Sequence, residues 1–69
     1  MRFEDYDYVE LLETIAPKLP AGTRGAIVMT YPVEPREYEV EFVDANGDTI
    51  EVRTVKESQL QRIERVSKP

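Results

Sequence analysis

Apolar and polar side chains alternate along residues 38–55, on both sides of an Asn46-Gly47 pair. A two-residue period is typical of β-strands with one buried and one solvated face, and Asn-Gly is a strong signal for a hairpin turn. The pattern therefore predicts a β-hairpin with strands over residues 38–43 and 49–55.

The length of the turn decides which residues of the hairpin face each other. A three-residue loop over 45–47 separates apolar from charged positions, whereas a two-residue loop mixes them on each face. In the longer loop Gly47 takes the left-handed conformation that follows a type I turn. The predicted pairs are Phe42–Ile50, Val40–Val52 and Tyr38–Thr54 on the inner face, with Glu41–Glu51 and Glu39–Arg53 on the outer face.

Of the remaining segments, one has a single predicted structure and two have alternatives. Residues 24–31 are apolar and β-branched, which predicts a strand. Residues 8–19 have apolar side chains at helical spacing, but a short strand over 8–12 followed by a long loop also fits. Residues 56–63 form either a helical turn leading to a short strand or a longer C-terminal helix.

Three stretches of the chain carry a family resemblance: residues 8–13 (YVELLE), 19–28 (LPAGTRGAIV) and 38–44 (YEVEFVD). Together they resemble a family of short bacterial proteins known as domain of unknown function 4926. The resemblance implies a mainly β fold, a small five-stranded SH3-like barrel with a long loop after strand one and a short helical turn before the last strand. Members of the family are similar to gene neighbours of suspected toxins, which implies an antitoxin or immunity role.

The barrel interpretation also defines an expected core. Ile15 and Leu19 of the long loop are expected to fold back and cap it. The inward set of residues 24–31 stays open, because Ile27 and Met29 are as apolar as Val28. The expected core residues are Val9, Leu11, Ala26, Val28, Val40, Phe42, Ile50, Val52 and Leu60.

Length and charge narrow the functional classes. The chain has 69 residues, no cysteine, no histidine and a net charge of −5, which fits one small acidic domain over residues 1–69. An acidic chain without a basic stripe argues against nucleic-acid binding, and no apolar run approaches the roughly 20 residues of a membrane span. We therefore expect a soluble, cytoplasmic protein with no nucleic-acid or membrane partner.

The chain offers little catalytic or metal-binding chemistry. Without histidine or cysteine it lacks the usual general base and the thiolate nucleophile. Residues 44–48 resemble the start of a calcium loop, but Thr49 and Val55 stand where that loop needs a glycine and a bidentate acid. We expect a non-enzymatic protein without metal or cofactor.

Two sets of residues are candidates for partner binding. Residues 34–51 hold seven acids and one base, so Glu39, Glu41 and Glu51 are predicted to contact a basic protein, with simple solvation of the face as the alternative. Tyrosines form the second set, because in SH3-like barrels they can line a shallow peptide groove. This set consists of Tyr6, Tyr8, Tyr31 and Tyr38, and of these Tyr31 and Tyr38 are added to the predicted partner-binding residues.

These observations predict a small protein-binding module, with an antitoxin or immunity protein that masks a basic partner as the first interpretation. A structural or docking subunit of a larger assembly is the alternative.

Overall fold

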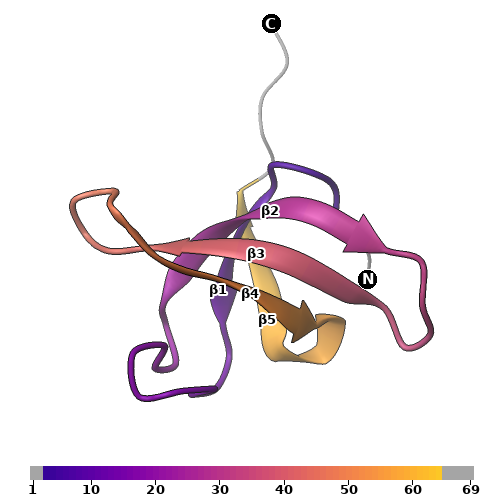
Figure 1. Cartoon of the computed structure of the whole chain (residues 1–69), viewed down its shortest axis with the longest axis horizontal. Coiled ribbons are helices and arrows are strands. Elements are labelled where there is room, and N and C mark those ends of the chain that lie inside the picture. Colours follow the sequence, from indigo (N-terminus) through magenta and orange to yellow (C-terminus); the bar gives the residue numbers. More distant parts are fainter. Residues whose placement is uncertain (1–2, 65–69) are drawn as a thin grey trace, which may run out of the picture.

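The structure, a computed structural model, describes residues 3–64. Within this range five antiparallel strands form one sheet in the order β4-β3-β2-β1-β5, and a single 3-10 turn is the only helical element (Figure 1). The elements are β1 (Tyr8–Leu11), β2 (Arg24–Tyr31), β3 (Glu37–Val43), β4 (Thr49–Lys56), η1 (Glu57–Gln59) and β5 (Leu60–Glu64).

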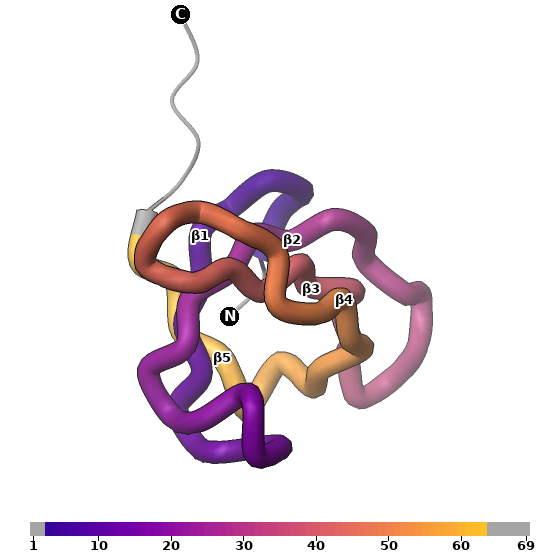
Figure 2. Tube along the Cα trace, turned by 60° about the vertical axis from the view of Figure 1, so that its left-hand side comes forward, coloured from indigo at the N-terminus to yellow at the C-terminus, as the bar shows by residue number. Residues whose placement is uncertain are grey.

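The sheet is strongly curved but not closed. Its strands bend around a common interior, as the trace in Figure 2 shows. β4 and β5 are the two edges of the sheet, and η1 leads from the end of one to the start of the other. The mainly β fold, the five strands, the long loop after β1 and the helical turn before β5 were all predicted, whereas the closed barrel is not formed.

The ambiguous segment after residue 8 is a short strand followed by a loop. β1 pairs with β2 on one side and with β5 on the other, which a helix could not do because its backbone groups bond within the helix. In the loop the Ile15 N–H donates to the Leu19 carbonyl (3.0 Å), and the Leu19 N–H donates to the Ala16 carbonyl (2.9 Å). Leu19 is fully buried, which confirms that the loop caps the core.

The β3–β4 hairpin has the predicted three-residue loop. Gly47 has a φ of 85°, and its N–H donates to the Asp44 carbonyl at 2.9 Å. The Asp44 N–H donates in turn to the Asp48 carbonyl at 2.9 Å, which closes the loop over 45–47. This geometry is a tight turn followed by a left-handed residue, the conformation that glycine adopts without strain.

Beyond this loop the predicted register of the hairpin is wrong. Val43 pairs with Thr49, but Phe42 pairs with Glu51, so Ile50 is an extra residue in a β-bulge. The bulge shifts the remainder of β4 by one position relative to β3. The observed pairs are therefore Glu41–Val52, Val40–Arg53, Glu39–Thr54 and Tyr38–Val55 in place of those predicted.

The core lies on the concave, inner face of the sheet. β3 contributes most to it, since Tyr38, Val40 and Phe42 are all 0% exposed. The other expected core residues that are buried are Val9, Leu11 and Leu60, while Ile50 is partly buried and packs against the core.

Two expected core residues face solvent because of bulges. Val52 is 48% exposed as a result of the bulge at Ile50. Val28 is 42% exposed because a second bulge, between Ile27 and Met29, turns Ile27 inward in its place. Ala26, also expected in the core, lies half-buried on the outer face opposite Glu41.

Truncation of one core residue and one outer residue tests this register. We expect Phe42→Ala to lower the free energy of unfolding by about 3–5 kcal/mol, because a fully buried ring would leave a cavity. Val52→Ala should change it by less than about 0.5 kcal/mol, since the side chain is half-exposed. Urea melts followed by circular dichroism measure both values. A large loss for Val52→Ala would contradict the observed pairing and support the one predicted from sequence.

Candidate functional site

The convex side of the sheet, called the outer face from here on, carries the candidate site. Tyr8 of β1 pairs with Ala26 of β2, Ala26 pairs with Glu41 of β3, and Glu41 pairs with Val52 of β4. Directly opposed residues of antiparallel strands project to the same side. These four residues therefore form one row across four strands.

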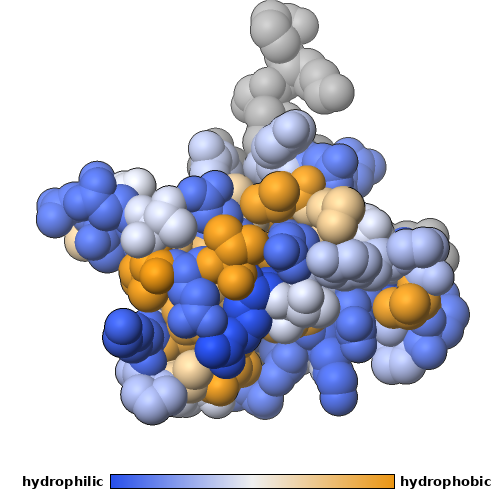
Figure 3. Space-filling model, viewed as in Figure 1, coloured by the Kyte–Doolittle hydropathy of each residue, from blue (hydrophilic) through white to orange (hydrophobic). Residues whose placement is uncertain are grey.

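A second row lies next to the first on the outer face. It runs from Met29 of β2 through Glu39 of β3 to Thr54 of β4. The two rows together place Glu41 between Ala26 and Val52, and Glu39 between Met29 and Thr54. In the space-filling view hydrophobic side chains over β2 and β3 are interspersed with hydrophilic ones (Figure 3).

Apolar exposure on this face is high for so small a domain. Contiguous exposed apolar surface on a soluble protein often marks an interaction site, whereas scattered single residues need no explanation. Here most of the exposed residues belong to neighbouring strands or to the turn that precedes β1. They are Tyr6, Tyr8, Val28, Met29, Val52 and Ile63, each between 38% and 64% exposed.

Glu39 is held in place by two hydroxyl groups. The Tyr31 hydroxyl donates to Glu39 Oε1 at 3.1 Å, and the Thr54 hydroxyl donates to the same oxygen at 3.0 Å. Within residues 3–64 no group donates to the second oxygen, Oε2. One side of the carboxylate is thus fixed to the sheet and the other is available to a partner.

Glu41 lies in the adjacent row and accepts a hydrogen bond from the Thr49 hydroxyl. An open groove runs beside it, lined among others by Tyr8, Ala26, Val43 and Ile63. In the part of the chain that the structure describes, neither Glu39 nor Glu41 forms an ion pair. Both carboxylates therefore lack an ion-pair partner within residues 3–64, on a face that also exposes apolar side chains.

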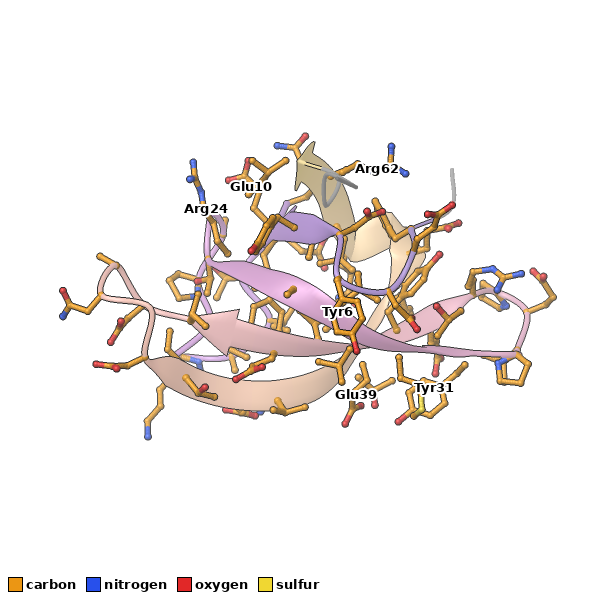
Figure 4. All side chains as sticks on the ribbon, turned by 90° about the horizontal axis from the view of Figure 1, so that it is seen from above. Tyr6, Glu10, Arg24, Tyr31, Glu39 and Arg62 are labelled. Atoms are coloured by element: carbon orange, nitrogen blue, oxygen red, sulfur yellow. The ribbon has the colours of Figure 1, made fainter. Side chains whose placement is uncertain are left out.

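Tyr6 reaches the outer face from the turn that precedes β1. Its N–H donates to the Ile27 carbonyl at 2.7 Å, so the turn lies alongside β2. Tyr6 has a φ of 72°, a left-handed conformation that a residue with a bulky side chain seldom adopts. Figure 4 shows its side chain extending across β2 toward the side from which Glu39 and Tyr31 project.

A buried acid fixes the turn that carries Tyr6. Asp7 is 1% exposed, and its Oδ2 accepts the Glu4 N–H at 2.9 Å and lies 3.2 Å from Arg62 Nε of β5. The Arg62 guanidinium also lies over the Phe3 ring, 5.8 Å from its centroid. The turn is thereby attached to edge strand β5, the neighbour of β1.

Two predicted partner-binding residues do not belong to the outer face. Glu51 pairs with the buried Phe42 and so projects to the inner side of edge strand β4, where its Oε2 lies 2.7 Å from Arg53 Nη2. Tyr38 is fully buried, which excludes it from contact with a partner. Glu39, Glu41 and Tyr31 are the predicted site residues that the structure brings together.

The buried Tyr38 hydroxyl joins three segments of the chain. It accepts the Phe3 N–H at 3.0 Å and donates to Glu57 Oε2 of η1 at 2.8 Å. Burial raises the pKa of Tyr38 above its usual value, the hydrogen bond to Glu57 raises that pKa further, and the Phe3 N–H opposes the shift. Tyr38 is thus a structural residue that stays neutral in the folded protein.

The acids of the hairpin turn have a local structural role. Asp44 Oδ1 accepts the Asn46 N–H at 2.8 Å and the Asp48 N–H at 3.0 Å, which stabilises the loop. Among the described residues no group of three or more potential ligand side chains could hold a metal ion. None of the helical segments in residues 3–64 is long and apolar enough to cross a membrane.

Comparison with known proteins agrees with the resemblance noted in the sequence. The family described as Domain of unknown function (DUF4926) matches residues 5–62. The chain belongs to this family. The match includes the turn with Tyr6, both outer-face rows and the Arg62 that fixes the turn. No curated protein and no solved structure matches the chain.

Sequence reasoning missed the apolar part of the site. The alternating pattern places Val52 in the core because it does not indicate the bulge at Ile50, and it does not decide which way Met29 faces. Tyr6 was identified only as one of four tyrosines. A signal existed for Met29, since residues 27–29 offer apolar side chains on both faces of their strand, but residues 50–52 carry no such signal because Glu51 lies between Ile50 and Val52.

The buried hydroxyl of Tyr38 makes the stability of the fold sensitive to alkaline pH. A folded-state pKa above that of the unfolded chain means that stability is complete below about pH 10 and declines as the pH rises through the folded-state pKa. Tyr38→Phe should cost about 1–3 kcal/mol at neutral pH, because the Phe3 N–H loses its buried acceptor. The difference between variant and wild type should shrink at about pH 11.

Urea melts at neutral and alkaline pH measure this effect. Tyr8→Phe is the matched control, since the ring is half-exposed and its hydroxyl makes no hydrogen bond within residues 3–64. A Tyr38→Phe variant with wild-type stability at both pH values would show that the hydroxyl does not join the three segments.

Proposed function

We propose that this chain is a non-enzymatic protein-binding module whose outer face docks against a basic protein. The observation that carries the proposal is the pair of uncompensated carboxylates, Glu39 and Glu41, set among exposed apolar side chains. Buried apolar contacts supply binding energy at protein interfaces, and complementary charge supplies selectivity and rapid association. A surface with both properties suits a partner that presents positive charge beside apolar groups.

The charge of the face disfavours a second copy of the chain as its partner. Two copies packed through this face would bring Glu39 and Glu41 of each into the same interface, and juxtaposed like charges oppose association. The net charge of −5 adds a repulsion of the same sign. A basic protein would experience neither of these two repulsions.

The biological role we propose is that of a cytoplasmic antitoxin or immunity protein. In this role the curled sheet acts as an open SH3-like module, and its acidic face masks a basic surface of the partner. The absence of cysteine is compatible with a reducing compartment. A docking subunit of a larger assembly is the alternative, and the amount of exposed apolar surface on the outer face also fits that role.

Partner capture by matched variants tests the proposal. The outer-face variant is Met29→Ser, Glu41→Gln, Val52→Ser, and the control is Leu12→Ser, Val33→Ser, Glu34→Gln. Both remove two exposed apolar side chains and one negative charge, but the control residues lie outside the strands, in the loops that follow β1 and β2. We expect a basic protein from the native host to be captured by wild type and control, with at least about tenfold weaker binding to the outer-face variant, or about 1.4 kcal/mol.

The purified pair then distinguishes the two roles. Association should slow as salt rises, because exposed charges are screened beyond about 10 Å at 0.1 M ionic strength. Rescue of growth when both proteins are expressed supports the antitoxin role, and stable co-migration with an enzyme without rescue supports the docking subunit. Equal capture by the outer-face and control variants would contradict both.

A further inference from the structure

We propose that Glu39 and Tyr6 together bind one arginine side chain of the partner. The inference rests on the proposed function, because it assumes that the outer face meets a basic protein. It names the side chain of the partner that contacts the outer face, which the proposed function does not specify.

The carboxylate of Glu39 is arranged in advance for a cation. Tyr31 and Thr54 donate to the same oxygen from strands on either side of β3, at 3.1 and 3.0 Å. The side chain has thus lost most of its rotational freedom before a partner arrives, which reduces the entropy cost of binding. Its second oxygen can accept an N–H from a guanidinium group, and charged hydrogen bonds of this type are the strong ones.

The exposed apolar surface of β2 beside Glu39 suits the aliphatic stem of a long basic side chain. The turn of Tyr6 is bonded to Ile27 of β2, and Ile27 pairs with the residue that follows Glu39 in β3. Val28 and Met29 occupy the intervening strand and are 42% and 45% exposed. An arginine could therefore lay its methylene groups on these two residues with its guanidinium at Glu39, on the side of β2 toward which the Tyr6 ring extends.

Tyr6 supplies an aromatic ring at the edge of this surface. The flat guanidinium of arginine stacks on aromatic faces, whereas the compact, strongly hydrated ammonium of lysine does so less readily. Figure 4 shows the Tyr6 ring extending over β2 toward the side from which Glu39 and Tyr31 project. These features favour arginine over lysine.

The backbone conformation of Tyr6 indicates that its ring has a role other than packing in the core. A φ of 72° is strained for tyrosine and would be relaxed for glycine or asparagine. The side chain is 64% exposed, so its burial does not compensate the strain. Strained residues of this kind concentrate at binding sites, where the surrounding structure holds them.

The test uses a capped peptide with one arginine between two leucines, titrated into isotopically labelled protein and followed by nuclear magnetic resonance. A matched peptide carries citrulline, which has the shape of arginine without its charge, and a third carries lysine. We expect saturable shifts at Met29, Glu39 and Thr54 with the arginine peptide, weaker shifts with lysine and none with citrulline. Equal shifts with citrulline would overturn the proposal.

Three single variants separate the contact from general electrostatics. Glu39→Gln retains an oxygen for the Tyr31 and Thr54 hydroxyls, and Tyr6→Asn places a residue that tolerates the left-handed backbone. Each should weaken binding of the arginine peptide at least tenfold, while Glu34→Gln, with the same loss of charge as Glu39→Gln, should leave it unchanged. Tyr6→Asn should also melt at or above the wild-type temperature, so that loss of binding cannot be attributed to unfolding.

The outcomes distinguish this inference from the proposed function. Wild-type peptide binding by both Glu39→Gln and Tyr6→Asn overturns the arginine site. If the outer-face variant still loses the protein partner in that case, the proposed function stands. If the outer-face variant also keeps the partner, both are wrong.

Discussion

The two-residue period of β3 divides the whole molecule into a buried side and an exposed side. Tyr38, Val40 and Phe42 alternate with Glu37, Glu39 and Glu41, and the first three are completely buried. β3 lies between β2 and β4 and has the most extensive pairing, so its alternation orients the strands on both sides. Neither the core nor the outer face could move by one residue along this strand without placing carboxylates in the interior.

The regular parts of the fold follow from sequence because local chemistry determines them. The alternation of residues 38–43 and the left-handed requirement at Gly47 are properties of a few neighbouring residues, and both predictions are confirmed. The register of β4 could not be obtained in this way. Ile50 and Val52 are both apolar, so the pattern has no signal for the bulge, and only packing against β3 decides which residue turns inward.

The candidate site shows the same division between local and long-range information. Acids on β3 were predicted from alternation, and Glu39 and Glu41 share a face as expected. The predicted register of β4 put Glu51 on the wrong face. Glu51 lies on the inner side of this edge strand and forms an ion pair with Arg53. Inward-pointing charges on an edge strand discourage it from pairing with the sheet of another chain. This ion pair therefore opposes aggregation through β4 and leaves the outer face free to bind a partner.

The contacts that attach the N-terminal turn to the rest of the fold reach far along the chain. Phe3 is bonded to a residue 35 positions away, and Asp7 to one 55 positions away in β5. Such non-local contacts form late in folding, because the entropy of closing the intervening chain must first be overcome. The turn with Tyr6 can therefore dock only after β3 and β5 are in place. A partner that needs this ring would bind the finished domain and not a chain still emerging from the ribosome.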